Sequence, residues 1–344
     1  MSRELVLITG ISGFVGYATL VLTLESGYRV RGVVRKSSQI DTIKHTLPEK
    51  LHPLLEFAVV ADVSSENALE KAMEGVNYIM HIASPGPSTS QEWERDYLRP
   101  AIDNTVSVLS AANGSPSVKR VIITSSAAAL VPIMDFATGD TVQSFIDNDA
   151  NISIGDDETC HYDLKQDFGV PFLAYTASKT MALDAAEDFM KSKRPGFDLI
   201  ILLPTFVFGA HYLARTPEEM ISSSNGLLLS YLRGKPDRPV TTNTVHIDDV
   251  AKLHVQSLDP TIPAGRYLLA SGGEAGTDWS EAIPAVKKHF PEAVGTTFVE
   301  KADIQALKIG IDDSKAEQTF GVEFKSFEEQ VKSSAGYYLS LLSK

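Results

Sequence analysis

Short apolar runs alternate with longer amphipathic stretches through the N-terminal half of the chain. The short runs are rich in β-branched residues and predict buried strands at Leu5–Thr9, Arg29–Val34, Leu55–Val60, Tyr78–Ile82 and Arg120–Ser125. Helical spacing of apolar residues predicts helices between them at Gly16–Ser26, Glu66–Met73 and Ala101–Ala112. Strands that alternate with helices favour right-handed crossovers and therefore a parallel sheet. The sequence thus predicts an α/β fold built on a doubly wound parallel sheet.

The pattern continues for one more strand and then changes. A sixth strand is expected over Asp198–Leu203, after a helix that begins near Ala174. Beyond it, prolines interrupt the regular alternation at Pro217, Pro236, Pro239, Pro260 and Pro263. We expect a sheet domain over 1–200, with 240–260 returning to it, and a smaller lobe formed mainly by 205–344. Because ligands of open α/β sheets bind outside the carboxyl ends of the strands, the smaller lobe is expected to close over that edge.

Composition limits the kinds of partner and compartment. The 344 residues carry a formal net charge of −13, which argues against a nucleic-acid partner because such proteins present basic faces. The apolar run after Glu4 is too short for a signal core or a membrane span. Cys160 is the single cysteine, as is usual in a reducing compartment. We expect a soluble cytoplasmic protein with no nucleic-acid or membrane partner, either a monomer or a homodimer.

A glycine-rich loop follows the first predicted strand directly and opens the first predicted helix. Glycines at this place let the backbone turn tightly, approach a pyrophosphate and pack the helix on the sheet. Free N–H groups at the helix start then face the phosphates. The loop therefore predicts a Rossmann-type dinucleotide site, although its spacing is one residue longer at the front than the usual fingerprint. The residues expected to bind the cofactor here are Gly10, Ser12, Gly13, Phe14, Val15 and Gly16.

The end of the second predicted strand indicates which dinucleotide is bound. NAD-binding proteins usually place a carboxylate there for the ribose 2′-hydroxyl, whereas an arginine suits a 2′-phosphate. This chain has Arg35 and Lys36 at that place, and no carboxylate occurs between Glu25 and Asp41. A planar, permanently charged guanidinium matches a phosphate dianion. The sequence predicts NADPH/NADP+ as the cofactor.

Tyr175 and Lys179 are the predicted catalytic pair. A step of one helical turn puts both side chains on one face of the helix that begins near Ala174. An ammonium group beside the phenol favours the phenolate, so the tyrosine can donate a proton to a carbonyl oxygen or remove one in reverse. The lysine has a second expected task, which is to bind the nicotinamide ribose.

A second pair with the same spacing, Tyr231 and Lys235, is interpreted differently. Gly234 lies inside this pair and Pro236 follows it, which predicts a helix end or a loop. We interpret this second pair as a surface coincidence.

Hydroxyl groups also lie at the carboxyl end of the fifth predicted strand, at Thr124, Ser125 and Ser126. Hydroxyls at the carboxyl end of a parallel strand face the edge where the cofactor is expected. A serine there can donate a hydrogen bond to a developing alkoxide. The alternative role is an ordinary one, because strand-end serines often cap the following turn.

Together these residues resemble the extended short-chain dehydrogenase/reductase family. Within it the chain is similar to the group of dihydroflavonol reductases, cinnamoyl-CoA reductases and yeast or fungal carbonyl reductases. The resemblance runs from about Leu5 to Asp259 and includes further segments in the family's order. These segments are Asp62-Val63, His81–Pro85, Pro204–Gly209 and Val245–Val250.

The resemblance implies roles for more residues. Ser126, next to Ala127, becomes the better candidate than Ser125 for the catalytic serine, and Asp62 and Val63 would meet the adenine. Pro204 and Thr205 would lie beside the nicotinamide. The remaining cofactor contacts implied by the resemblance are Ile82, Ala83, Ser84, Thr124, Ser125 and Val207.

Differences between this sequence and the family's patterns limit which substrates and reactions are expected. The approach Pro171-Phe172-Leu173-Ala174 lacks the aromatic and cysteine run of plant cinnamoyl-CoA reductases, which disfavours a CoA thioester. Ala127 and Ala128 stand where sugar-nucleotide dehydratases place an Asp-Glu pair. The stretch between Ser126 and Tyr175 is longer than in the plant enzymes and is expected to form part of the substrate rim.

We therefore expect an enzyme that reduces an aldehyde or a ketone to an alcohol with NADPH. Tyr175 would supply the proton, Ser126 would orient the carbonyl, and Lys179 would support the tyrosine. Two alternatives stay open: a sugar-nucleotide epimerase or dehydratase that retains NAD, and a non-enzymatic sensor of NADP.

Other noticeable residues are expected to be structural. Cys160-His161 is predicted to lie in a loop with no metal bound. His246, Asp248 and Asp249 are expected to cap a helix start and pack between the lobes, in preference to holding a metal. For the aromatic group Phe206, Phe208 and Tyr212 the sequence favours neither a substrate pocket nor the core.

Overall fold

The chain forms two compact units in a computed structural model. The structure describes residues 4–65, 67–84, 90–131, 152–235, 240–241, 243–302, 306–307 and 309–343. The first unit contains the described residues of Met1–Met134, Asp157–Leu203 and Ala251–Tyr267. The second contains those of Asp135–Asp156, Pro204–Val250 and Leu268–Lys344. Glu66, Pro85, Pro236, Pro239 and the part of the expected substrate rim over 132–151 lie outside the described residues.

A seven-stranded sheet is the framework of the first unit within the described part of the chain. Its order is β11-β7-β5-β4-β1-β2-β3, and the registers from β3 through β7 are parallel. The strands are β1 (Leu5–Thr9), β2 (Arg29–Val34), β3 (Leu55–Val59), β4 (Tyr78–His81), β5 (Arg120–Thr124), β7 (Asp198–Pro204) and β11 (Gly265–Leu269). The doubly wound α/β fold is therefore confirmed, and the six expected strands match within one residue at each end. β11 is a seventh strand that the sequence analysis missed.

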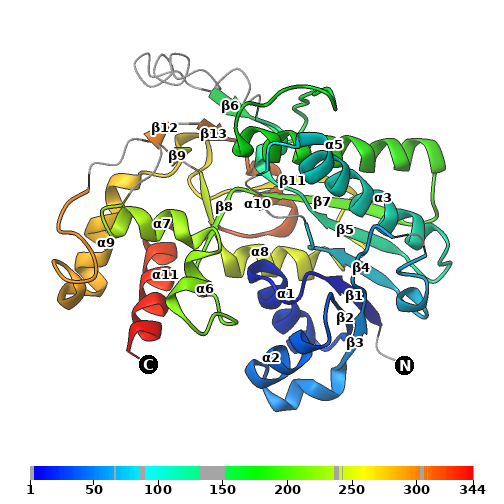
Figure 1. Ribbon diagram of the computed structural model, residues 1–344, viewed down its shortest axis with the longest axis horizontal. Helices are drawn as coiled ribbons and strands as arrows, with labels where there is room; N and C mark the ends of the chain where they lie inside the picture. Colours follow the sequence, from blue (N-terminus) through cyan, green and yellow to red (C-terminus); the bar gives the residue numbers. More distant parts are fainter. Residues whose placement is uncertain are drawn as a thin grey trace. The chain divides into compact units, whose positions relative to one another are not determined.

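Helices cover the two faces of this sheet. α3 and α5 lie side by side on one face, and α1 packs against β1 and β2 from the other (Figure 1). The α-helices of this part of the chain are α1 (Phe14–Glu25), α2 (Ser38–Thr46), α3 (Arg99–Asn113) and α5 (Pro171–Lys193). Shorter helical turns are η1 (Glu49–Leu54), η2 (Lys71–Met73), the π-helical η3 (Glu94–Leu98) and η4 (Ala127–Ala129).

The helix expected over Glu66–Met73 is wrong. Of its described residues only Lys71–Met73 forms a single 3₁₀ turn. A tight turn precedes this segment, in which Asp62 accepts hydrogen bonds from the backbone and hydroxyl of Ser64. Asn67 then adopts a left-handed backbone with φ of 59°. Local bonding of Asp and Ser side chains competes with a helix, and apolar spacing alone does not reveal it.

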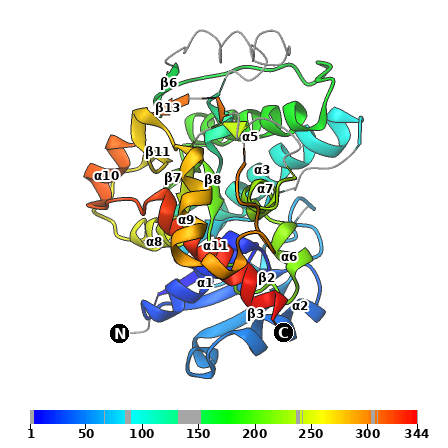
Figure 2. The ribbon, with the colours of Figure 1, turned by 90° about the vertical axis from the view of Figure 1, so that its left-hand side faces the viewer.

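The second unit is built around its own apolar core. Trp279 lies at its centre, with ring centroids 5.7 Å from Phe208, 5.4 Å from Tyr231 and 5.3 Å from Phe327. Helices α9 and α11 lie side by side in this unit (Figures 1 and 2). Tyr231 is only 2% exposed at the end of α7, so the expected helix end is confirmed but the surface interpretation is wrong for this residue. Lys235 is exposed.

The remaining elements complete the chain. Short parallel pairs form between β8 (Phe206–Phe208) and β10 (Thr244–His246), β6 (Ile152–Ile154) and β13 (Ile309–Ile311), and β9 (Val240–Thr241) and β12 (Ala306–Leu307). The helices are α6 (Pro217–Ile221), α7 (Asn225–Leu232), α8 (Ile247–Gln256), α9 (Ala282–His289), α10 (Ser314–Phe320) and α11 (Phe327–Leu342). The 3₁₀ turns are η6 (Gly273–Ala275), η7 (Trp279–Glu281) and η8 (Pro291–Ala293). The chain re-enters the first unit at Ala251, in the middle of α8.

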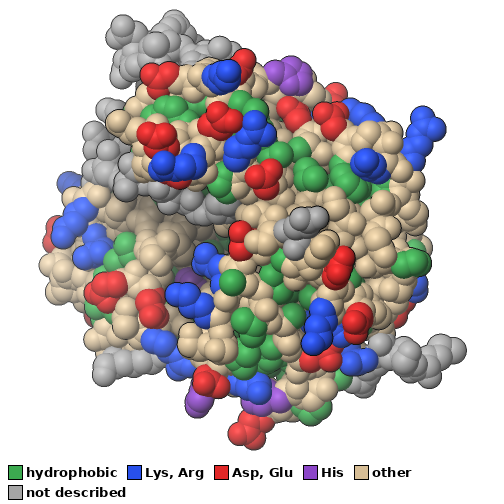
Figure 3. Space-filling model, turned by 45° about the vertical axis from the view of Figure 1, so that its right-hand side comes forward, with side chains coloured by type: hydrophobic (Ala, Val, Ile, Leu, Met, Phe, Trp, Pro, Cys, Tyr) green, Lys and Arg blue, Asp and Glu red, His purple; other side chains and the backbone are tan. Residues whose placement is uncertain are grey.

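The surface charges are mixed. On the face drawn in Figure 3, the described basic and acidic side chains are interspersed. This distribution agrees with a protein whose net charge of −13 comes from many separated groups.

A buried arginine ties the chain back onto β5 within the first unit. The Arg120 side chain is 4% exposed and donates to the carbonyl oxygens of Ser257, Asp259 and Ile262 at 2.6–3.0 Å. It also bonds the Asp198 carboxylate at 3.1 Å. One guanidinium therefore pairs several carbonyl groups of the segment that follows α8.

We expect Arg120→Met to lower the free energy of unfolding by about 3 kcal/mol, because it leaves these acceptors without their donor. Arg29→Met is the matched control, since Arg29 is half exposed and 3.5 Å from Glu56. An exposed pair of this kind is worth about 1 kcal/mol or less. Urea unfolding measures both variants, and equal losses would contradict the structural role of Arg120.

Candidate active site

The glycine loop can turn this tightly only because two of its residues, Gly10 and Gly16, have no side chain. Gly10 has φ of +79°, and a Cβ there would lie 2.7 Å from the backbone nitrogen of Ala83. A Cβ on Gly16 would lie 2.0 Å from the carbonyl oxygen of Gly10. Neither atom can move away cheaply because both belong to backbone. The loop therefore needs glycine at both positions to let β1 turn directly into α1.

Gly13 is different, because the fold itself does not require a glycine there. It is exposed, its φ is −103°, and a Cβ would meet only the Gly10 carbonyl oxygen at 3.4 Å. Immediately after it, α1 begins at Phe14. The first N–H groups of a helix have no partner within the helix itself. An open glycine surface next to a helix N-terminus fits the pyrophosphate of a dinucleotide.

Thr9 joins the end of β1 to the end of β4. Its Oγ1 accepts hydrogen bonds from the backbone N–H groups of Ile82 and Ala83 at 3.2 and 3.1 Å. Because both partners can only donate, the single Thr9 hydroxyl proton goes to Nδ1 of His81, 2.9 Å away. Since Nδ1 accepts this proton, the neutral His81 ring carries its own proton on Nε2. Burial, with a smaller effect from the charge of Lys179, lowers the pKa of His81 to about 4. Neither Thr9 nor His81 was predicted individually from the sequence, because their contact joins two strands that are far apart in the chain.

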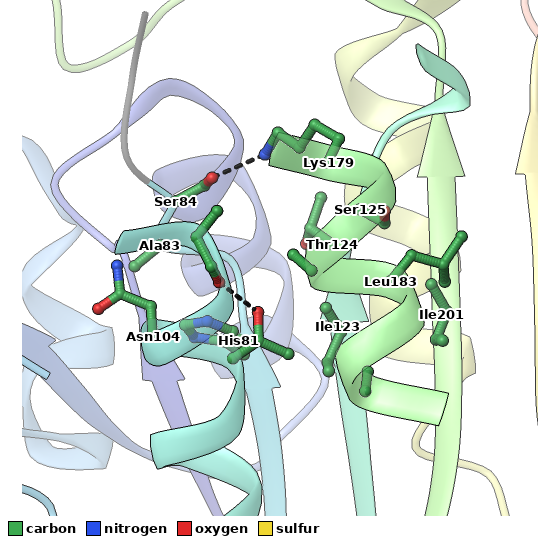
Figure 4. Close-up of a pocket in the computed structure, with 14 residues that line it drawn as sticks. His81, Ala83, Ser84, Asn104, Ile123, Thr124, Ser125, Lys179, Leu183 and Ile201 are labelled. Atoms are coloured by element: carbon green, nitrogen blue, oxygen red, sulfur yellow. Dashed lines mark hydrogen bonds between the residues drawn. The ribbon is translucent and has the colours of Figure 1, made fainter. Parts of the chain in front are cut away.

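Lys179 and Tyr175 share one face of α5. The helix has Pro171 in its first turn, where proline is well tolerated. Two lysines lie in its last turn, where their positive charge stabilises the negative end of the helix dipole. Lys179 is 7% exposed, and its Nζ donates to Ser84 Oγ at 2.7 Å and lies 5.3 Å from the centre of the Tyr175 ring. Figure 4 shows the Lys179 amine pointing at Ser84. The half-buried Tyr175 hydroxyl forms no hydrogen bond to another described residue.

A small cavity lies below this lysine, inside the first unit (Figure 4). Its volume of about 30 Å³ corresponds to roughly one water molecule. The described residues around it bring several candidates together, namely Ala83, Ser84, Thr124, Ser125 and Lys179. Thr124 is also bonded to His254 Nε2 at 2.6 Å, which ties the end of β5 to α8.

Ser126 caps a turn, and its hydroxyl proton is bonded to no described residue. Its Oγ accepts a hydrogen bond from the backbone N–H of Ala128 at 3.2 Å, at the start of η4. An accepting hydroxyl can still donate its own proton. Ser126 is therefore a turn cap, as the alternative held, and retains the donor that a carbonyl oxygen would need.

The basic turn after β2 is exposed. The side chains of Arg35 and Lys36 form no hydrogen bond or ion pair with any other residue that the structure describes. Both backbone N–H groups instead donate to the side chain of Gln39. The charged ends are thus free for an anion.

The adenine-side candidates follow β3. Asp62 is exposed, and hydrogen bonds from Ser64, followed by one from Ser65, lower the pKa of its carboxyl group below the usual value. The carbonyl oxygen of Val63 accepts from Ser107 on α3 at 2.6 Å. These contacts hold the segment after β3 against α3.

The nicotinamide-side candidates belong to the second unit. Pro204 ends β7, and Thr205 donates from both its backbone nitrogen and its hydroxyl to the carbonyl oxygen of Leu269, at 3.0 and 3.1 Å. Val207 is buried in β8.

Cys160, His161 and His246, which were expected to be structural, lie in a loop and at a helix start. Cys160 and His161 lie in an irregular segment, where Cys160 Sγ is 3.4 Å from the carbonyl oxygen of Leu130. His246 Nδ1 accepts from the backbone N–H of Asp248 at 3.0 Å, so capping of α8 is confirmed. Among the described residues, no group of three or more His, Cys, Asp or Glu side chains is placed to hold a metal. Phe208 is fully buried in the core of the second unit, whereas Tyr212 is 54% exposed.

Comparisons with known proteins agree with this geometry. Residues 6–268 match the NAD dependent epimerase/dehydratase family. The ketoreductase sphI of Aspergillus fumigatus is 36% identical over 96% of both chains. A Candida albicans protein, GRP2, provisionally named an NADPH-dependent methylglyoxal reductase, is 26% identical over 97% of this chain and 98% of its own. The solved structure of yeast methylglyoxal/isovaleraldehyde reductase Gre2 with NADPH covers 99% of both chains at 21% identity, with a TM-score of 0.82.

A sheet of this order, carrying a glycine loop and a Tyr/Lys pair one turn apart, defines a dinucleotide-dependent protein of the extended short-chain type. The chain belongs to the NAD dependent epimerase/dehydratase family. This confirms the resemblance that the sequence motifs indicated. In the described part of the chain, no helix has the length and apolar character needed to cross a membrane.

Substitution of Gly16 and substitution of Gly13 are expected to have different effects. We expect Gly16→Ala to lower the melting temperature of the cofactor-free protein strongly, because its Cβ has no room. Gly13→Ala is expected to leave that temperature nearly unchanged and to weaken NADPH binding about tenfold or more. Thermal melting and a fluorescence titration with NADPH measure the two effects. A Gly13→Ala protein that binds NADPH as wild type does would rule out this surface as the pyrophosphate site.

His81 predicts a dependence of stability on pH. Its folded-state pKa of about 4 lies below the ordinary value of 6.5, so the unfolded chain binds the proton more readily. Stability from the neutral ring is present above pH 6.5 and is lost as pH falls towards 4, by about 3 kcal/mol at most. His81→Asn keeps an acceptor near Thr9 but does not titrate. Unfolding free energies from pH 7 to 4.5 should fall less steeply in this variant, and parallel slopes would refute the assignment.

Proposed function

We propose that this chain is an NADPH-dependent carbonyl reductase that reduces an aldehyde or a ketone to an alcohol. The observation that carries the proposal is the Tyr175 ring, which lies 5.3 Å from the buried Lys179 ammonium and whose hydroxyl forms no hydrogen bond to a described residue. The ketoreductase relative, similar over almost its whole length, supports reduction over the epimerase, dehydratase and sensor alternatives. A small carbonyl compound is the partner of this reaction, and the cytoplasm is the proposed location.

The residues of the chain fit this cofactor. Arg35 and Lys36 supply free positive charge for the 2′-phosphate, and the surface at Gly13 admits the pyrophosphate. We assign the adenine to Asp62 and Val63 and the nicotinamide side to Pro204, Thr205 and Val207. The remaining proposed contacts are Gly10, Ser12, Phe14, Val15, Gly16, Ile82, Ala83, Ser84, Thr124, Ser125, Tyr175 and Lys179. We propose a dinucleotide-binding domain over 1–200, with 240–260 returning to it, and a mainly substrate-binding lobe over 205–344.

When bound, NADPH supplies the hydride that reaches the carbonyl carbon. Tyr175 donates its phenolic proton to the carbonyl oxygen, which completes the alcohol and leaves a phenolate. The Lys179 ammonium lies 5.3 Å from the centre of that ring and stabilises the negative charge. Ser126 donates a hydrogen bond to the same carbonyl oxygen and polarises it before the proton arrives.

Ser84 has a positioning role in this scheme. Its Oγ accepts a hydrogen bond from the Lys179 ammonium at 2.7 Å. This bond holds the lysine side chain in place beside Tyr175. The neutral His81 below it adds no positive charge next to the ammonium. Ser84 thus directs the Lys179 amine without a carboxylate partner among the described residues around the cavity.

Tyr175→Phe tests the proposal directly. Oxidation of NADPH, followed by nicotinamide absorbance, is measured with a panel of aldehydes, α-keto esters and aryl ketones. Removing the proton donor should lower kcat by about 10²–10⁴-fold on any substrate that the wild type accepts. Tyr231→Phe is the matched control, because Tyr231 lies in the core of the second unit and should keep kcat. Full activity of Tyr175→Phe would remove Tyr175 from the reaction.

A further inference from the structure

The side chain of Gln39 joins two segments of the proposed cofactor site. Its Oε1 accepts hydrogen bonds from the backbone N–H groups of Arg35 and Lys36, at 2.9 and 3.1 Å. Its Nε2 donates to the Oγ of Ser12, in the glycine loop, at 2.8 Å. One amide therefore connects the end of β2 to the turn that follows β1.

The direction of this amide is fixed by its partners. Two backbone N–H groups converge on one side, and only the carbonyl oxygen of an amide can accept both of them. A flipped amide would place its NH2 group against two donors, at a cost comparable to two lost hydrogen bonds. Gln39 is half-buried near the start of α2, whereas the Arg35 and Lys36 side chains beside it are exposed.

The bonds constrain the backbone and leave the charges free. The backbone N–H groups of Arg35 and Lys36 donate to Gln39, whereas their charged side-chain ends have no partner among the described residues. An arginine that recognises a phosphate binds more tightly when its backbone is already held in the binding orientation. The hydrogen bond to Ser12 fixes the position of Gln39 relative to the glycine loop, because Ser12 lies between Gly10 and Gly16 in that loop.

We infer that Gln39 is a positioning residue for cofactor choice, which sets the preference for a dinucleotide with a 2′-phosphate by holding the Arg35–Lys36 turn against the glycine loop. This inference rests on the proposed function, in which Arg35 and Lys36 meet that phosphate. A purely structural role at the start of α2 would act on folding and would affect NADPH and NADH equally. The two roles therefore differ in the ratio of the two affinities.

The test compares Gln39→Ala, Gln39→Glu and Arg35→Ala with wild type. Dissociation constants for NADPH and NADH are measured by fluorescence, together with thermal melting of the cofactor-free proteins. Gln39→Ala should raise the NADPH constant about tenfold and leave the NADH constant within about twofold. In steady state, KM for NADPH should rise while kcat stays the same.

Gln39→Glu separates the bonds from the charge. A carboxylate still accepts both backbone N–H groups, but it places a negative charge beside the phosphate. We expect it to melt like wild type and to lose more NADPH affinity than Gln39→Ala, with NADH binding again little changed. Gln318→Ala, at an exposed glutamine of α10, is the control and should bind both cofactors normally.

The outcomes distinguish this inference from the proposed function. If Arg35→Ala lowers the preference for NADPH but Gln39→Ala and Gln39→Glu do not, the role of Gln39 is refuted and the phosphate site stands. Equal weakening of NADPH and NADH by Gln39→Ala reduces Gln39 to a structural residue. If Arg35→Ala leaves the preference unchanged, the phosphate site itself is wrong and the inference falls with it.

Discussion

The absence of two Cβ atoms is the constraint on which the rest of the site depends. Gly10 lets the backbone after β1 pass close to the backbone of Ala83, and Gly16 lets it pass close to the carbonyl oxygen of Gly10. Only that close passage places the start of α1, the exposed surface of Gly13 and the hydroxyl of Ser12 at the carboxyl edge of the sheet. The same passage brings Thr9 close enough to bond the residues that follow β4.

From this loop, short polar contacts extend in two directions. On one side Thr9 is hydrogen-bonded to the buried His81 at the end of β4, and Ser84 in the following segment accepts a hydrogen bond from the Lys179 ammonium beside Tyr175. On the other side Ser12 accepts from Gln39, which fixes the basic turn after β2. Most of these contacts are hydrogen bonds of modest energy, and together they align the ends of β4, β1 and β2. In the proposed function, the chemistry and the choice of cofactor therefore depend on the same turn of the backbone.

Much of this could be predicted from the sequence, because strand burial and glycine spacing are local patterns. The six strands, the loop and the helix that carries Tyr175 and Lys179 follow from them. What depends on contacts distant in sequence could not be predicted. β11 returns to the sheet from beyond α8, Tyr231 is buried by Trp279, and Gln39 acts through Ser12. The assigned site residues stay a prediction until they are tested with the cofactor.

The central claim is direct transfer of hydride from NADPH to a carbonyl carbon with net consumption of the cofactor. The most direct measurement is a turnover with NADPH that carries deuterium at C4 of the nicotinamide, prepared in each of its two stereochemical forms. Mass spectrometry of the alcohol should find one deuterium on the carbinol carbon with one of the two forms and none with the other. A product without deuterium from both forms, or a cofactor returned in its starting oxidation state, would contradict the account.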